Sequence, residues 1–260
     1  MASAPQQPQL PMFYQDLMPL NTRDHMKFRN RLRESAPWLA NQHVVPLTAD
    51  EFVQAARHYP IIFSAGENPL PLALFGLNEG VNTFFDDNGK MIDPVYVPAY
   101  VRRYPFILAK LSSENEDLSL CFDPTADSVG EFDQGEPFFN EDGSTTDQTK
   151  AILDFCEKFE QAGARTKLLT DELQKHDLLM DGEVSIRRDD NEQPFVYRGF
   201  QMVDQAKLRE IRGDVLRGWN QNGLLALVFA HLFSLDLTRE IFARQIRQGK
   251  GPSTNAASNG

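Results

Sequence analysis

The first half of the chain alternates short helical and strand-like patterns of apolar and polar residues. Residues 47–59 (LTADEFVQAARHY) have the spacing of a short amphipathic helix. Thr48, with Glu51 three residues later, predicts a capping box at the start of this helix, and Pro60 ends it. The apolar runs IIFSA and LPLALFGL that follow are typical of buried strands. NTFFDDNGKM then predicts two more strands joined by a turn at Asn88–Gly89.

This order of patterns occurs twice, which predicts an internal duplication. Each copy would contain a helix, a Tyr-Pro pair, two strands, a Phe-Phe strand and a glycine turn. Proline fixes its own φ and disfavours helix at the residue before it, so the Tyr-Pro pair would turn the chain from helix to strand. The matching segments, each aligned without gaps, are 56–65 with 101–110, 70–75 with 117–122, and 82–89 with 136–143.

The second half of the chain has mainly helical patterns. A long run after Gly143 begins with Thr145 and Gln148, a second candidate capping box. Gly163 is a position where this helix is expected to kink or split. The apolar residues of the run follow steps of three and four, at Ile152, Phe155, Cys156, Phe159 and Ala162.

A β-hairpin and four short helices follow this run. The hairpin, residues 182–200, has two β-rich runs around a polar turn at Asp189–Glu192. Asp204 is the expected N-cap of the first short helix, and Gly223 is the expected end of the second. The sequences LLALVFAHLFSL and LTREIFARQIRQ are the remaining two predicted helices.

We therefore predict an α+β fold with a β-rich N-terminal half and a helical C-terminal half. The β-rich half would be built from the helix–strand–strand–hairpin duplication, and the helical half would contain one β-hairpin. The predicted segments are a disordered N-terminus (1–11), a basic N-terminal arm or connector (12–43), the duplicated region (44–145), the helical region packed on it (146–248) and a disordered tail (249–260).

Charge and hydropathy narrow the classes of function. The chain has 37 acidic and 26 basic residues and a net charge of −11, so nucleic-acid binding, which needs a dense basic face, is not expected. The N-terminus has neither the basic residues nor the apolar core of a secretory signal. GLLALVFAHLF, the strongest apolar run, is too short to span a bilayer. We therefore expect a cytoplasmic chain without a transmembrane segment.

The candidate interaction residues are arginines in two places. Residues 21–35 are basic within an acidic chain, and they form either a solvated connector or a binding arm. The pair at 102–103 is expected in the last turn of a helix, where cations face exposed carbonyl groups, so a structural role is favoured there. The candidates are Arg29, Arg31, Arg33, Arg102 and Arg103.

Residues that could carry catalysis or bind metals form no recognised pattern. The five histidines have no partner at a metal-ligand spacing, and His231 is expected to be a core histidine with a satisfied ring nitrogen. Cys121 and Cys156 are expected to be reduced core residues. The sequence has no phosphate-binding loop, nucleophile elbow or zinc-protease motif. We predict no cofactor and no metal, and a non-enzyme is favoured over an enzyme.

Several longer stretches together resemble the bacterial SapC family. They lie between Met12 and Ile241 and read VVPLTADEFVQAARHYPIIF, PLALFGLNEGVNTFFDDNGK, YVPAYVRRYPFIL, GFQMVDQAKL and NGLLALVFAHLFSL. Members of the family often have a tryptophan soon after the DNG turn, whereas Met91 follows Lys90 in this chain.

The resemblance implies a function as well as a family. SapC is named after a protein associated with a paracrystalline surface layer, and similar sequences occur near genes for flavin-dependent halogenases, cupin-type hydroxylases and TonB-dependent receptors. This implies a non-catalytic accessory that binds an unknown protein partner in a surface-layer or outer-membrane nutrient-uptake system. The alternative is an enzyme, or a partner of an oxygenase or halogenase, with a ligand site between the duplicated halves. Some relatives are labelled peptide-transport permeases, which would need membrane spans that this sequence lacks.

Overall fold

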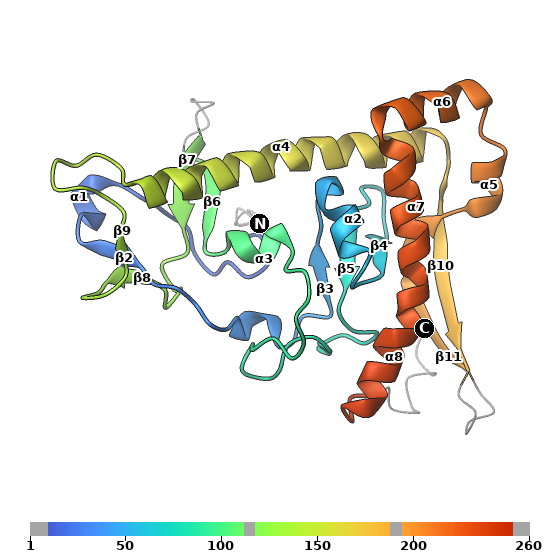
Figure 1. Ribbon diagram of the computed structural model, residues 1–260, viewed down its shortest axis with the longest axis horizontal. Helices are drawn as coiled ribbons and strands as arrows, with labels where there is room; N and C mark the ends of the chain where they lie inside the picture. Colours follow the sequence, from blue (N-terminus) through green and yellow to red (C-terminus); the bar gives the residue numbers. More distant parts are fainter. Residues whose placement is uncertain (1–9, 112–117, 188–193, 252–260) are drawn as a thin grey trace, which may run out of the picture. The chain divides into compact units, whose positions relative to one another are not determined.

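The computed structural model describes residues 10–111, 118–187 and 194–251 (Figure 1). Within these residues the chain forms a mixed α and β structure whose sheets are antiparallel. It divides into a first unit, Met1–Glu34 with Arg102–Phe159, and a second unit, Ser35–Val101 with Glu160–Gly260. The segments predicted from the sequence follow one another along the chain, whereas each of these units combines two separate parts of it. The predicted segment boundaries stay predictions. The predicted disordered ends lie mostly outside the described residues.

The first unit contains two three-stranded sheets. One has the order β1 (Met18–Pro19), β7 (Leu118–Phe122) and β6 (Phe106–Lys110). The other has the order β8 (Val129–Glu131), β2 (Phe28–Asn30) and β9 (Glu136–Pro137). The short helix α1 (Thr22–His25) precedes β2, and the side chain of Asn21 caps it by accepting a hydrogen bond from the Asp24 N–H.

The core of the first unit is largely aromatic. Its strands pack with the first part of the long helix α4 (Asp147–Lys175). The buried cluster consists of Phe106, Leu108, Phe122, Val129, Phe138, Phe139 and Cys156. Both cysteines of the chain are buried and are not joined in a disulfide, which confirms the prediction that they are reduced core residues.

The second unit is built on a five-stranded sheet. The strand order is β10 (Leu179–Ile186), β11 (Phe195–Val203), β4 (Ile61–Ser64), β5 (Pro71–Leu74) and β3 (Val44–Pro46). The predicted hairpin is therefore present as β10 and β11, although its predicted turn at Asp189–Glu192 lies outside the described residues. Because β11 pairs with β4, strands from both halves of the chain share one sheet.

The C-terminal helices follow the order predicted from the sequence. They are α5 (Gln205–Arg209), α6 (Gly213–Asn222), α7 (Leu224–Ser234), η3 (Leu235–Leu237) and α8 (Thr238–Arg247). Asp204 caps α5 by accepting hydrogen bonds from the Ala206 and Lys207 N–H groups, as predicted. Gly223 ends α6 with a φ of 83°, also as predicted. The earlier short helices are η1 (Pro37–Leu39), η2 (Ala49–Glu51), α2 (Phe52–Ala55) and α3 (Ala99–Arg103).

The predicted capping box at Thr48 is present at the start of η2. One carboxylate oxygen of Glu51 accepts hydrogen bonds from the Thr48 N–H (2.9 Å) and hydroxyl (2.8 Å). The other accepts from the Tyr96 hydroxyl (2.9 Å) and the Ala99 N–H (2.6 Å). Glu51 is buried. Four donors therefore satisfy a buried carboxylate, which ties η2 to the segment that leads into α3.

Helix α7 is attached to the sheet through His231 and Ser234, both of which are fully buried. His231 Nδ1 donates to the Ile61 carbonyl at 2.8 Å, and its Nε2 accepts from the Val203 N–H at 3.1 Å. The Ser234 hydroxyl oxygen accepts from the Ile61 N–H at 2.8 Å. Burial lowers the pKa of His231 to about 4, so the ring is neutral near pH 7. The predicted core histidine is confirmed.

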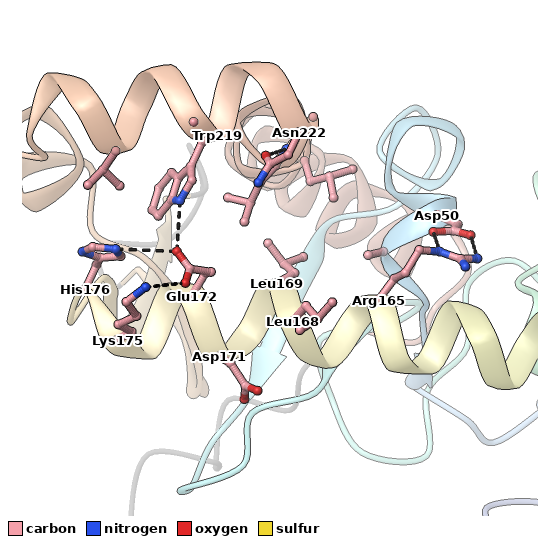
Figure 2. A pocket seen from close by; sticks show the side chains of 16 residues that line it. Asp50, Arg165, Leu168, Leu169, Asp171, Glu172, Lys175, His176, Trp219 and Asn222 are labelled. Carbon is pink, nitrogen blue, oxygen red and sulfur yellow. Dashed lines mark hydrogen bonds and ion pairs between the residues drawn. The ribbon is translucent and has the colours of Figure 1, made fainter.

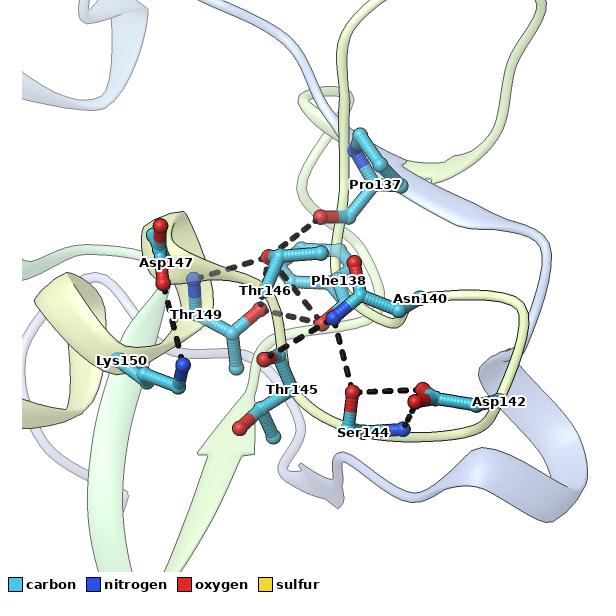
Figure 3. Close-up of polar contacts among 10 residues, drawn as sticks. All are labelled: Pro137, Phe138, Asn140, Asp142, Ser144, Thr145, Thr146, Asp147, Thr149 and Lys150. Carbon is cyan, nitrogen blue, oxygen red and sulfur yellow. Dashed lines mark hydrogen bonds and ion pairs between the residues drawn. The ribbon is translucent and has the colours of Figure 1, made fainter.

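The start of α4 differs from the prediction by one residue. Thr146, not Thr145, is the cap, because its hydroxyl oxygen accepts a hydrogen bond from the Thr149 N–H at 3.3 Å (Figure 3). Thr145 instead forms a β-bridge with Phe139. The helix continues through Gly163 without interruption, so the predicted split at that glycine is wrong, whereas the predicted kink stays a prediction.

The two copies proposed from the sequence have matching hydrogen bonds between their strands. The Pro60 carbonyl accepts from the Leu74 N–H, and the Pro105 carbonyl accepts from the Asp123 N–H, both at 3.0 Å. Leu74 therefore corresponds to Asp123, whereas the gap-free alignment placed it on Cys121. That part of the alignment was out of register by two residues, because the loops between the strands differ in length.

The turns at Gly89 and Gly143 also correspond to each other. Each was predicted to join two strands, but each is closed by a single β-bridge instead. One bridge closes each turn: Phe85 pairs with Met91 in the first, and Phe139 pairs with Thr145 in the second. In each turn the glycine has a positive φ, which suits a residue without a Cβ. The duplication itself stays a prediction.

Candidate functional site

A groove of about 970 Å³ lies in the second unit, between the C-terminal part of α4 and the junction of α6 with α7 (Figure 2). We call it the α4–α6 groove. Along α4 its lining runs from Arg165 to His176, which is about three helical turns or roughly 16 Å. Its volume lies at the upper end of the range of about 300–1,000 Å³ that is usual for ligand sites.

Helix α4 ends beside the groove, and the chain reverses its direction at Asp177. Asp177 has a φ of 50°, and its N–H bonds to the Gln174 carbonyl at 2.9 Å. The Leu178 N–H bonds to the Leu173 carbonyl at 2.9 Å. These two bonds define a Schellman motif, in which the left-handed position is usually glycine. Lys207 donates to the Asp177 carbonyl at 3.0 Å and so holds this position.

Most of the groove lining is apolar. Leu169 and Leu224 are buried, and Val215 and Leu227 are half-buried. Leu168 differs from these, because 65% of it is exposed. It lies beside the buried stripe of α4 and presents an apolar side chain to the groove (Figure 2).

The wall formed by α6 has no side chain at Gly218. A Cβ at this position would meet no atom within 4 Å, and the backbone there is not in the left-handed region. Neither packing nor conformation therefore requires glycine, which costs about 1 kcal/mol relative to alanine inside a helix. The missing side chain leaves this part of the groove open.

One end of the groove has a polar cluster around Glu172. The carboxylate accepts hydrogen bonds from Lys175 Nζ at 2.7 Å and from Trp219 Nε1 at 3.2 Å. His176 Nε2 lies 3.6 Å from the same carboxylate, and its ring meets the Trp219 ring edge-on at 5.4 Å. The hydrogen bonds from Lys175 and Trp219 lower the pKa of Glu172, so this carboxylate is ionised near pH 7.

The other end of the groove has a bidentate ion pair. Arg165 Nε donates to Asp50 Oδ1 at 3.0 Å, and its Nη2 donates to Oδ2 (Figure 2). This hydrogen bonding raises the pKa of Arg165. A third carboxylate, that of Asp171, accepts from Lys167 at 2.7 Å. The groove therefore has an apolar middle between two charged ends.

Comparison with known protein families identifies the chain. The model of the SapC family matches residues 20–241. The chain belongs to the SapC family. No curated protein and no solved structure matches it significantly.

Two further properties of the SapC-family protein bear on its chemistry. A membrane-spanning helix needs about 20 apolar residues. Within residues 10–111, 118–187 and 194–251, no helix combines that length with that apolarity. In the same part of the chain, no group of three or more His, Cys, Asp or Glu side chains could hold a metal ion.

The structure places one part of the basic segment of this SapC protein in a sheet. Residues 28–30 form β2, the central strand between β8 and β9, so this part of the segment is not the solvated connector considered from the sequence. Arg29 donates to the Gly135 carbonyl at 2.9 Å. The guanidinium of Arg31 lies 3.4 Å from the centre of the Phe132 ring. Both side chains therefore make contacts that stabilise the first unit.

The remaining candidate arginines also lie on aromatic rings. Arg33 donates to the Tyr104 carbonyl and lies 5.2 Å from the centre of that ring, and burial lowers its pKa. Arg103 is buried and lies 4.1 Å from the centre of the Phe159 ring. Arg102 lies over another phenylalanine ring of α4, at 5.2 Å. As expected, both arginines of the pair are in the last turn of α3. Whether any candidate arginine binds a partner stays a prediction.

The sequence did not predict the groove residues of the SapC-family protein. The groove is lined by three stretches that are far apart in the chain, residues 49–50, 165–176 and 215–227, and no short motif joins them. One signal was present. The apolar residues that predict the buried face of α4 form a stripe along the helix, and Leu168 lies beside this stripe. An amphipathic helix does not need an apolar residue at that position.

Proposed function

We propose that this SapC-family protein is a non-catalytic accessory that binds a partner protein through the α4–α6 groove. The observation that carries the proposal is the exposure of Leu168, at 65%, inside an open groove whose lining is mostly apolar. Contiguous exposed apolar surface is typical of interaction sites. The association with a bacterial surface-layer or outer-membrane nutrient-uptake system is part of the proposal and is supported by membership of the family.

The electrostatics of the groove favour binding over acid–base catalysis. A general acid or base works best when its pKa lies near the operating pH. The pKa of Glu172 is instead lowered, because Lys175 and Trp219 donate hydrogen bonds to its ionised form. These partners fix the carboxylate as a structural anion that joins two helices.

A capture experiment with matched variants tests the proposal. Gly218→Trp places a large side chain in the groove, whereas Gly163→Trp adds the same side chain at another open helical position outside the groove lining. We expect tagged wild-type protein and Gly163→Trp to capture the same partner from a lysate of the source bacterium, and Gly218→Trp to lose it. Equal capture by both variants would contradict the proposal.

The basic segment needs its own variant in this experiment. Replacing Arg29 and Arg31 by glutamine removes two positive charges from the first unit and leaves the groove unchanged. We expect this variant, once shown to be folded, to retain the partner. Loss of the partner in this variant alone would assign binding to the basic arm instead.

Two further measurements address location and the alternative function. We propose a cytoplasmic location, whereas the family name implies the cell surface, and protease treatment of intact cells separates these two locations. The alternative, an enzyme or an oxygenase or halogenase partner, stays a prediction. Stoichiometric iron or flavin in the purified protein would favour it and contradict the non-catalytic role.

A further inference from the structure

We propose that the occupant of the α4–α6 groove is an amphipathic helix of about three turns, with one apolar face and lysine or arginine at its flanks. This inference rests on the proposed function, because it names the partner's binding element. An amphipathic helix lying in an apolar groove is a common mode of protein recognition.

The dimensions of the groove fit a helix of this length. The lining covers about three turns of α4, or roughly 16 Å, and three turns of a second helix span the same distance. On the opposite wall, Gly218 has no side chain, and no atom beyond its chain neighbours and the adjoining backbone of α6 lies within 4 Å of its Cβ position. A helix in the groove can therefore approach the α6 backbone closely at this point.

The arrangement of polar and apolar groups fits an amphipathic occupant. Figure 2 shows Leu168 and Leu169 between the Asp50–Arg165 pair at one end and the Glu172 cluster at the other. An apolar face in the middle of the occupant would cover the exposed Leu168. Its flanking side chains would then lie near the charged ends.

The charges of the lining favour basic flanks. Three lining residues carry carboxylates, Asp50, Asp171 and Glu172, and each is paired with one cation, Arg165, Lys167 and Lys175 respectively. The side chains of the three carboxylates are 46%, 48% and 32% exposed, so each can accept a further hydrogen bond. The chain as a whole has a net charge of −11, which favours approach of a cationic partner.

Synthetic peptides test this inference directly on the full-length protein. The first peptide has about 12 residues, with leucines spaced i, i+3, i+4 and i+7 and lysines elsewhere. The second has glutamate in place of every lysine. The third has the composition of the first in an order that is not amphipathic as a helix. Fluorescence anisotropy of the labelled peptides gives their affinities at low and at physiological salt.

We expect the lysine peptide to bind wild type at least about tenfold more tightly than the other two peptides, with an affinity that falls as salt rises. Gly218→Trp should weaken its binding by a similar factor, and Gly163→Trp should not. Leu168→Gln, at an exposed position where folding is not at risk, should also weaken it. The inference would be overturned if the glutamate peptide or the third, non-amphipathic peptide bound as tightly as the lysine peptide. It would also be overturned if Gly218→Trp and Leu168→Gln left the affinity for the lysine peptide unchanged.

The two proposals fail in different ways. If Gly218→Trp abolishes capture of a cellular partner but the lysine peptide does not bind wild type, the groove is the binding site and its occupant is not a basic helix. If Gly218→Trp captures the cellular partner as well as wild type does, the proposed function of the groove fails, whatever the peptides do.

Discussion

The Trp219 indole N–H donates a hydrogen bond to the Glu172 carboxylate at 3.2 Å, and this bond joins α6 to α4 at one end of the groove. Trp219 is buried, whereas Glu172 is partly exposed. The bond therefore connects the wall of the groove to the long helix at the boundary with solvent. We expect the position of α6, and with it the width of the groove, to depend on this contact.

Trp219→Phe should destabilise the protein modestly, because it removes the donor and keeps an aromatic ring. Hydrogen bonds to charged groups contribute about 1.5–3 kcal/mol, and partial exposure of the acceptor reduces this, so we expect a loss of about 1 kcal/mol. Urea unfolding followed by circular dichroism measures the change. An unfolding midpoint equal to that of wild type would show that this bond does not hold α6.

Glu51→Ala should be much more destabilising, because the four donors that Glu51 satisfies would lose their acceptor in a buried place. Buried unsatisfied groups cost about 1–3 kcal/mol each, with partial relief from rearrangement, so we expect a loss of about 3 kcal/mol or more. Glu51→Gln should lie between alanine and wild type. Glu67→Ala, at an exposed position, is the control and should change stability by less than about 0.5 kcal/mol. If the Glu51 and Glu67 variants were equally stable, the role given to this carboxylate would be wrong.

His231 should make stability depend on pH between about 7 and 5. Its pKa is lowered to about 4 in the folded protein, whereas an unfolded histidine titrates near about 6.5. The unfolded chain therefore binds more protons in this range, and stability decreases as pH falls through it. We expect this residue to account for about 2 kcal/mol of lost stability between pH 7 and pH 5. Unfolding of wild type and His231→Gln at a series of pH values should show a shallower decrease for the variant; parallel curves would contradict the account.

Gly182→Ala and Gly163→Ala should have opposite effects. A Cβ at Gly182 would lie 2.2 Å from the Phe200 ring, so the substitution forces a buried ring to move and should cost about 1–3 kcal/mol. A Cβ at Gly163 meets no atom within 4 Å, and alanine there should stabilise the helix by about 0.5–1 kcal/mol. Thermal unfolding of the two variants checks both signs. A stabilised Gly182→Ala would show that β10 and β11 do not pack as described.

The order of elements could be predicted because it depends on local signals. Asp204 begins one helix and Gly223 ends another, and both effects depend only on residues close to them in the chain. The residue types in the sequence are therefore enough to predict these helix ends. Even so, a local signal can be ambiguous. Two adjacent threonines, Thr145 and Thr146, both fit a cap, and the bridge from Phe139 decides between them.

The candidate site could not be predicted, because it depends on contacts between distant residues. Nothing in the local sequence indicates that Arg165 pairs with Asp50 or that Trp219 reaches Glu172. For the same reason the sequence could not show that Arg31 lies on Phe132, which is distant in the sequence. The composition of a segment shows its charge, but tertiary contacts decide whether that charge is available to a partner.

Amide hydrogen exchange, measured on the protein alone and in complex with the captured partner, tests the central claim most directly. We expect binding to slow exchange in residues 213–227, which form α6 and the start of α7, and in residues 165–176 of α4. Exchange in β2, residues 28–30, should not change. Protection of β2 with unchanged exchange at 213–227 and 165–176 would show that the partner binds elsewhere and that the α4–α6 groove is not the functional site.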